Sequence, residues 1–250
     1  MTPGQRLSTL ILLPFLFSIP ACAAATGPDG ARVYANPDRF ESSIKAFERA
    51  DEKNPPAADG IVVIGSSSIA KWRSTIEKDL APLKIIPRGF SGSTMNDALY
   101  YADRLINKYH PRAVVVYEGD NDIAAGIAPQ KISDTFTALV AAIHSKLPDT
   151  HIYLISIKPS PSRKSLWPKS VEANNLMRAT CDADKTLTYV SVVEPMLASD
   201  GSVRTELFGL DRLHMNAKGY ALWSKVLRPI LLSDQSATAS AQHASAKTNH

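Results

Sequence analysis

The chain has 250 residues, of which 44% are hydrophobic and 21% are charged, and its formal net charge at neutral pH is +4. This length and composition are those of one globular domain with a substantial core, and they exclude a disordered or fibrous chain. The excess positive charge is small. No cluster of Lys and Arg interleaved with aromatic residues is present, so the sequence does not support nucleic-acid binding.

The first 25 residues have the features of a secretory signal peptide. Arg6 precedes an apolar run over residues 10–19, and small residues follow that run. Such a segment is removed on export and is too short to span a bilayer. Two cleavage sites compete: a sequence resembling a bacterial lipoprotein box would leave Cys22 lipidated and tether the protein to a membrane, whereas cleavage after Ala23 or Ala25 would discard Cys22. We therefore expect an exported bacterial protein, periplasmic or extracellular.

If Cys22 is kept and lipidated, Cys181 is the only other cysteine, and if Cys22 is discarded, Cys181 is the only cysteine of the mature chain. The sequence therefore offers no disulfide framework, despite the expected export. A single cysteine in a helical, apolar context is expected to be a buried small residue rather than a reactive thiol.

Helices and strands alternate along the rest of the chain. Apolar residues at three-to-four spacing predict helices, and continuous β-branched runs predict strands that are buried on both faces. The predicted helices cover 38–53, 94–109, 129–143, 169–182 and 217–231, and the predicted strands cover 61–64, 84–87, 113–117, 152–157 and 187–193. This alternation implies right-handed crossovers and hence an α/β fold, a three-layer sandwich with a five-stranded parallel sheet. We place this domain at 30–232 and predict a disordered tail over 233–250, because the tail is polar and aperiodic.

Polar segments whose side chains could take part in catalysis lie where the first three predicted strands end. They cover residues 65–68, 89–94 and 119–122, and a fourth such segment, 211–214, precedes the last helix. Ligands of open parallel sheets collect at the carboxyl ends of the strands, where the loops converge. Each segment alone is compatible with a turn or a helix cap. Their occurrence together, in order and at one edge of the sheet, predicts an active site.

The residue types in these segments suit acyl transfer. A serine hydroxyl needs a base within hydrogen-bond reach, and a histidine can serve if a carboxylate fixes its tautomer. Asp211 lies three residues before His214, in a loop where Asn216 is expected to cap the last helix. That spacing can place Asp211 against Nδ1 of His214 and leave Nε2 facing Ser67.

An acyl-transfer site also needs donors for the oxyanion that develops on the substrate. Gly92 lacks a Cβ atom and can bring its backbone N–H close to the substrate. The side-chain amide of Asn121 and the backbone N–H of Ser67 are the other candidate donors.

These four segments together resemble a known family. Residues 61–68 are similar to the first block of the SGNH (GDSL-like) hydrolases, residues 88–94 to the second, 119–122 to the third block Gly-x-Asn-Asp, and 211–214 to the last block Asp-x-x-His. The resemblance covers roughly residues 60 to 231. It implies a flavodoxin-like sheet, a triad of Ser67, His214 and Asp211, and an oxyanion hole that includes Gly92 and Asn121.

Two positions depart from the family pattern. Ser66 stands where the family often has Asp, and Ser68 follows the candidate nucleophile, so three adjacent serines are nominal candidates. The alignment of the block favours Ser67. Pro87 stands where the second block usually begins with Asn, a change that we expect to affect loop support rather than chemistry.

The resemblance implies a serine esterase that acts through an acyl-enzyme on short acyl chains, such as acetyl esters of glycans, or on lysophospholipid-type esters. Two alternatives are an acyltransferase that uses the same site and a glycan-binding protein without turnover. The sequence lacks a Gly-x-Ser-x-Gly elbow, a His-Glu-x-x-His zinc motif, a phosphate loop and a dinucleotide fingerprint, so no cofactor and no metal are implied. The sequence does not indicate an oligomeric state.

Overall fold

The computed structural model describes residues 25–26 and 32–248. Its centre is a five-stranded parallel sheet with the strand order β4-β3-β5-β6-β7. The strands are β3 (Ile61–Gly65), β4 (Ile85–Gly89), β5 (Ala113–Tyr117), β6 (His151–Ile155) and β7 (Leu187–Val190). A separate antiparallel pair joins β1 (Ala25–Thr26) to β2 (Arg32–Val33). The predicted α/β class and the five-stranded parallel sheet are confirmed.

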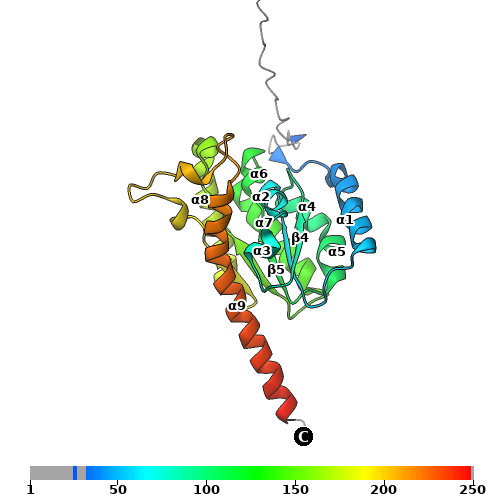
Figure 1. The fold of residues 1–250 in the computed structure, drawn as a ribbon. Coiled ribbons are helices and arrows are strands. Elements are labelled where there is room, and N and C mark those ends of the chain that lie inside the picture. The colour runs from blue at the N-terminus through cyan, green and yellow to red at the C-terminus, as the bar shows by residue number, and fades with distance from the viewer. Residues whose placement is uncertain (1–24, 27–31, 249–250) are drawn as a thin grey trace, which may run out of the picture.

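Helices cover both faces of the sheet and make a three-layer sandwich (Figure 1). One face packs into a core with α1, α4, α5, α7 and α8, and the other with α2, α3 and α9. The helices are α1 (Glu41–Lys53), α2 (Ser67–Trp72), α3 (Ile76–Asp79), α4 (Met95–Tyr100), α5 (Ala102–Leu105), α6 (Asp120–Ala124), α7 (Pro129–His144), α8 (Trp167–Asp182) and α9 (Ala217–Thr248), with 3-10 turns η1 (Pro37–Phe40), η2 (Asn107–Tyr109), η3 (Pro161–Leu166), η4 (Glu194–Met196) and η5 (Thr205–Leu207).

The strand order reverses at β3, which lies between β4 and β5. The chain runs from β3 outward to β4 and then returns to the other side of β3. Such a reversal makes loops leave the sheet in opposite directions and opens a crevice at the carboxyl ends. Here the register pairs Gly65 with both Gly89 and Tyr117, so three strands end in one row. The segments that follow these three residues therefore start side by side.

The helix predicted over 94–109 is divided in the structure. It forms α4, α5 and the turn η2, and the breaks fall at Tyr101 and Ile106. The side chains of Tyr101 and Ile106 are buried all the same. Apolar spacing predicts which face is buried, but it does not reveal an interruption of the backbone hydrogen bonding.

The end of the chain also differs from the sequence prediction. The last helix was expected to stop at Leu231 and to be followed by a disordered tail over 233–250, whereas α9 continues to Thr248 and projects beyond the sheet (Figure 1). Residues 233–248 contain no Gly or Pro and are rich in Ala, a composition that favours helix although it offers no apolar face. The predicted signal peptide over 1–25, including Cys22, lies outside the described residues except for Ala25. Among the described residues, no helix is both long and apolar enough to cross a membrane.

Helix α2, which carries Ser67, packs closely on the end of β4. A Cβ atom placed on Gly89 would overlap the backbone nitrogen of Ala70 and the backbone carbon of Ile69. The overlap is with backbone, so no side-chain rotation can relieve it. Gly89 is therefore required for the distance between α2 and the sheet, and that distance sets the position of Ser67.

We predict that Gly89→Ala lowers the free energy of unfolding by about 1–3 kcal/mol, because overpacking a close backbone contact forces the helix to shift. Urea denaturation measures this change. Gly209→Ala is the control, since a Cβ atom there would meet only the carbonyl oxygen of His214, at 3.7 Å. Equal stability of the two variants would contradict the close-packing argument.

Candidate active site

Ser67 is the first residue of α2 and lies two residues after Gly65, the carboxyl end of β3. The three adjacent serines differ sharply in exposure: Ser66 is 2% and Ser68 1% exposed, whereas Ser67 is only partly buried. The backbone carbonyl of Ser66 accepts the first hydrogen bonds of α2, and that of Ser68 accepts one from the Tyr220 hydroxyl at 2.9 Å. Of the three hydroxyl groups, Ser67 Oγ is the one that meets a histidine.

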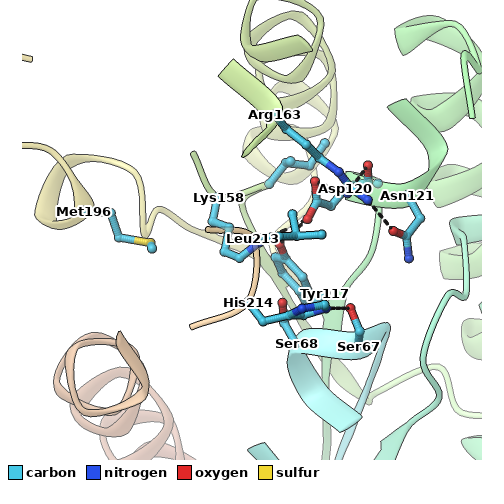
Figure 2. Close-up of polar contacts among 12 residues, drawn as sticks. Ser67, Ser68, Tyr117, Asp120, Asn121, Lys158, Arg163, Met196, Leu213 and His214 are labelled. Carbon is cyan, nitrogen blue, oxygen red and sulfur yellow. Dashed lines mark hydrogen bonds and ion pairs between the residues drawn. The ribbon is translucent and has the colours of Figure 1, made fainter. Parts of the chain in front are cut away.

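Ser67, His214 and Asp211 form a continuous hydrogen-bonded chain. Ser67 Oγ lies 2.8 Å from His214 Nε2, and His214 Nδ1 lies 2.6 Å from Asp211 Oδ2 (Figure 2 shows the first contact). A carboxylate can only accept here, so His214 carries its proton on Nδ1 and presents the lone pair of Nε2 to the serine. This arrangement can draw the hydroxyl proton from Ser67.

The Asp211 carboxylate is held by its own loop. Its other oxygen, Oδ1, accepts the backbone N–H groups of Leu213 and His214, at 3.0 and 2.9 Å. Partial burial acts to raise the pKa of Asp211, but the hydrogen bonds from the His214 ring and from these two amides outweigh it and lower the pKa to about 2. Asp211 is therefore charged wherever His214 needs a carboxylate partner.

The loop that carries Asp211 and His214 is fixed at both ends. The backbone N–H of Gly209 donates to the His214 carbonyl at 2.8 Å, and Arg212 between them takes a left-handed conformation with φ of 56°. Asn216 caps α9 as expected, because its Oδ1 accepts the N–H groups of Lys218 and Gly219. A strained non-glycine residue inside such a closed loop is a common feature of functional sites.

The loop after β4 and the turn after β5 meet beside Ser67. Gly92 has φ of +89°, a left-handed value that favours glycine, and Asn121 Nδ2 donates to the carbonyl of Ser93 at 2.9 Å. Thr94 caps α4 through a reciprocal capping box with Asp97. The structure thus brings Gly92 and Asn121, the two predicted oxyanion residues, to the same edge of the sheet as Ser67.

Glu118 binds the loop after β4 through Ser93. Nothing in the sequence pointed to this role except the position of Glu118 directly after β5. Its side chain is fully buried, and its Oε1 accepts the Ser93 hydroxyl at 2.6 Å. Burial, helped by the nearby charge of Asp122, raises the pKa of Glu118 well above its ordinary value and so favours the uncharged acid. Burial also raises the pKa of Asp122, to about 6.

Sequence reasoning also missed Lys158 and Arg163, which come from the segment after β6. Both form ion pairs with Asp120, at 3.1 and 2.5 Å, and Arg163 also donates to Asn121 (Figure 2). The only available signal was that these two cations follow a buried strand at the same sheet edge. Within the part of the chain that the structure describes, no group of three His, Cys, Asp or Glu side chains is placed to hold a metal ion.

A match to a protein-family model over most of the domain identifies the family of this chain. Residues 59–222 match the model of the GDSL-like lipase/acylhydrolase family, a span that contains all five predicted site residues. The chain belongs to this family. Family membership makes it a carboxylic ester hydrolase of the SGNH superfamily, and the α/β sandwich agrees with that assignment.

Solved structures with this fold come from several bacteria. A GDSL-like lipase from Bacteroides thetaiotaomicron is similar with a TM-score of 0.63 at 18% identity, over 80% of this chain and 98% of that chain. A proposed acylhydrolase from Bacteroides fragilis has a TM-score of 0.66 at 18% identity, over 81% and 99%. An acetyl-xylooligosaccharide esterase from Geobacillus stearmophilus has a TM-score of 0.57 at 12% identity, over 69% and 93%. No curated protein matches the sequence.

The pKa of Asp211 near 2 leads to a prediction for this GDSL-like hydrolase. As the pH falls from 7 toward 4, Asp211 stays ionised and keeps its hydrogen bond to the His214 ring. Protonation of Asp211 should therefore add nothing to the acidic fall of kcat/KM, and the logarithm of kcat/KM should fall with a slope of no more than one above pH 4. A slope of two above pH 4 would show that Asp211 or another essential carboxylate titrates there as well.

Replacement of Asp211 by Asn should lower kcat by about 10³–10⁴-fold, because the amide favours the tautomer with the proton on Nε2. Steady-state kinetics on a chromogenic ester measures the loss. Asp184→Asn provides the control, since Asp184 accepts the backbone N–H of Thr186 in the same manner but lies before β7, at the opposite edge of the sheet from the site. A loss in the Asp211 variant of less than tenfold would contradict the orienting role.

Proposed function

We propose that this protein is a serine esterase in which Ser67 is the nucleophile, His214 the general base and Asp211 the carboxylate that orients the base. The observation that carries the proposal is the uninterrupted chain of hydrogen bonds from Ser67 Oγ through the imidazole to Asp211, at 2.8 and 2.6 Å. Ser66 and Ser68 have no such partner. The family supplies ester hydrolysis as the class of chemistry.

The proposed reaction has two steps. Ser67 Oγ attacks the ester carbonyl carbon while Nε2 of His214 takes the hydroxyl proton, and the C–O bond to the alcohol breaks as His214 returns that proton to the leaving oxygen. Water, deprotonated by the same nitrogen, then attacks the acyl-enzyme and releases the carboxylic acid from Ser67. The N–H groups of Ser67, Gly92 and the Asn121 side chain are the proposed donors to the oxyanion.

A pocket beside the His214 loop, which Arg212 of that loop lines, offers a place for the alcohol part of a substrate. Its volume is about 290 Å³, and its apolar wall includes Pro159, Trp167, Leu197 and Val203, with Arg212 on the rim. Trp72 and Trp223 are fully buried in the core, whereas Trp167 retains a partly exposed face. An exposed indole face next to a catalytic loop suits the ring of a sugar.

We infer an acetyl ester of a glycan as the preferred substrate class, with lysophospholipid-type esters second. The Geobacillus enzyme of the same fold acts on acetyl-xylooligosaccharide, which is consistent with this preference. Export, suggested by the N-terminal sequence, would bring the enzyme to such polymers. A transferase using the same site would need an acceptor hydroxyl, so acyl release into plain buffer separates hydrolysis from transfer.

The direct test of the proposal is hydrolysis of a chromogenic ester series from acetyl to palmitoyl by the parent and by Ser67→Ala. We expect the highest kcat/KM for acetyl or butyryl and a loss of at least about 10³-fold in the Ser67 variant. Ser66→Ala and Ser68→Ala are the matched controls and should lose far less. Undiminished activity in Ser67→Ala, or no hydrolysis by well-folded parent, would overturn the assignment.

Trp167→Ala should raise KM for acetylated oligosaccharides by about 5- to 20-fold, because the ring loses its stacking surface, and should leave kcat nearly unchanged. Val171→Ala, one turn further along α8 and partly exposed, is the control. Steady-state kinetics on acetylated xylo-oligosaccharide and on a simple acetate ester compares the two substrates. An equal effect on both substrates would argue against a sugar-binding role for Trp167.

A further inference from the structure

Arg163 makes three hydrogen bonds or ion pairs at the turn after β5. Its Nη1 donates to the backbone carbonyl of Asp120 at 2.7 Å and pairs with Asp120 Oδ1 at 2.5 Å, and its Nη2 donates to Asn121 Oδ1 at 3.0 Å (Figure 2). One planar guanidinium therefore binds the main chain of one residue and the side chains of two adjacent residues. Such a fork fixes orientation far better than the single point charge of a lysine.

The contact with Arg163 decides which way the Asn121 amide faces. A guanidinium has donors only, so the atom of Asn121 that faces it must be the oxygen Oδ1. The Nδ2 group is thereby turned to the opposite side, where one of its two N–H bonds goes to the Ser93 carbonyl at 2.9 Å. The second N–H of Asn121 has no protein acceptor among the described residues, so it is available to a substrate oxygen.

A buried ion pair holds Arg163 in this position. Asp120 is 7% exposed, and Lys158, with a side chain 1% exposed, pairs with its Oδ2 at 3.1 Å. Burial acts to raise the pKa of Asp120, but the charges of Lys158 and Arg163 outweigh it and lower the pKa, so the carboxylate is ionised. Two cations around one buried carboxylate leave the guanidinium little freedom to turn away from Asn121.

The turn that carries Arg163 also contacts the other half of the site. The backbone N–H of Ser162 donates to the carbonyl of Arg212 at 3.1 Å, within the loop that holds Asp211 and His214. Ser162 and Arg163 are adjacent residues of η3. A single short segment therefore contacts the loop of the proposed base and the proposed oxyanion donor at once.

We propose that Arg163 is a positioning residue that orients the Asn121 amide as an oxyanion donor, with Asp120 and Lys158 holding the guanidinium in place. This proposal rests on the proposed function of Asn121, and it goes further by assigning a role to an ion-pair network behind the site. Arg163 does not touch the reacting atoms in this arrangement. Its effect on the reaction passes through Asn121.

The test is a double-mutant cycle on the purified protein with a chromogenic acetate ester, using Arg163→Ala, Asn121→Ala and the double variant. We expect Arg163→Ala to lower kcat by about 10- to 100-fold with KM within about threefold, since an oxyanion donor acts mainly in the transition state. In the Asn121→Ala background the same change should cost less than about threefold. Equal losses in both backgrounds would overturn the proposal, because Arg163 would then act independently of Asn121.

Two further variants separate positioning from folding. Arg163→Lys keeps the charge beside Asp120 but cannot donate to Asp120 and Asn121 together, so it should lose nearly as much kcat as the alanine variant while its thermal midpoint stays closer to the parent. Arg178→Ala, an exposed arginine on α8 paired with Asp182, should match the parent in kcat. Full activity in Arg163→Lys would contradict the requirement for a fork.

A readout without catalysis distinguishes failure of this proposal from failure of the proposed function. In protein labelled with ¹⁵N-asparagine, the side-chain signals of Asn121 are identified by their loss in Asn121→Ala. Arg163→Lys should shift or broaden these signals, and Arg178→Ala should leave them in place. An inactive parent would refute the esterase proposal while this measurement still tested the contact, and unchanged signals in Arg163→Lys would refute the positioning role.

Discussion

The whole site depends on the register of the sheet, which pairs the last residues of β3, β4 and β5 with one another. Gly65 pairs there with Gly89 on one side and Tyr117 on the other, and the backbone N–H of Phe90 donates to the Gly65 carbonyl at 2.9 Å. Three loops therefore leave the sheet within one strand spacing of each other. The glycines allow α2 to lie on this row, so the backbone itself places Ser67 beside the Gly92 loop and Asn121. The loop before α9 then brings His214 to the same edge.

Two buried carboxyl groups beneath the site, Asp120 and Glu118, avoid an uncompensated buried charge in different ways. Asp120 stays charged because Lys158 and Arg163 surround it, and removal of either cation would leave a buried charge poorly compensated. For Glu118, burial raises the pKa well above its ordinary value and so favours the uncharged acid, and its Oε1 accepts the Ser93 hydroxyl. Its Oε2 is buried without a hydrogen-bond partner in the described part of the chain, which costs free energy directly beneath the loop that carries Gly92 and Ser93. The charged network and Glu118 both act on the segments that carry Ser93 and Asn121, and so fix these loops from two sides.

Much of this arrangement could be predicted from sequence, for identifiable reasons. Buried strands such as 61–64 are continuous β-branched runs, and the parallel sheet then requires the carboxyl ends of its strands to meet, which brings Ser67, Gly92 and Asn121 together. The pairing of Asp211 with His214 follows from a spacing of three residues within one loop. Arg163 and Glu118 could not be assigned in this way, because their roles depend on which side chains face one another across the sheet edge. The continuation of α9 past Leu231 was missed because the tail has helix-forming composition without an apolar face, so amphipathic periodicity carried no signal.

The central claim is that acyl groups pass through Ser67, and trapping the intermediate tests it most directly. The protein is mixed with a chromogenic acetate ester, quenched in acid within milliseconds, digested and mapped by mass spectrometry. We predict one acetyl group on the peptide that contains residues 66–68, assigned by fragmentation to Ser67, at a higher steady level in Asp211→Asn if deacylation slows more than acylation. Acetyl on Ser66 or Ser68, or ester turnover with no acylated serine in that peptide, would contradict the mechanism.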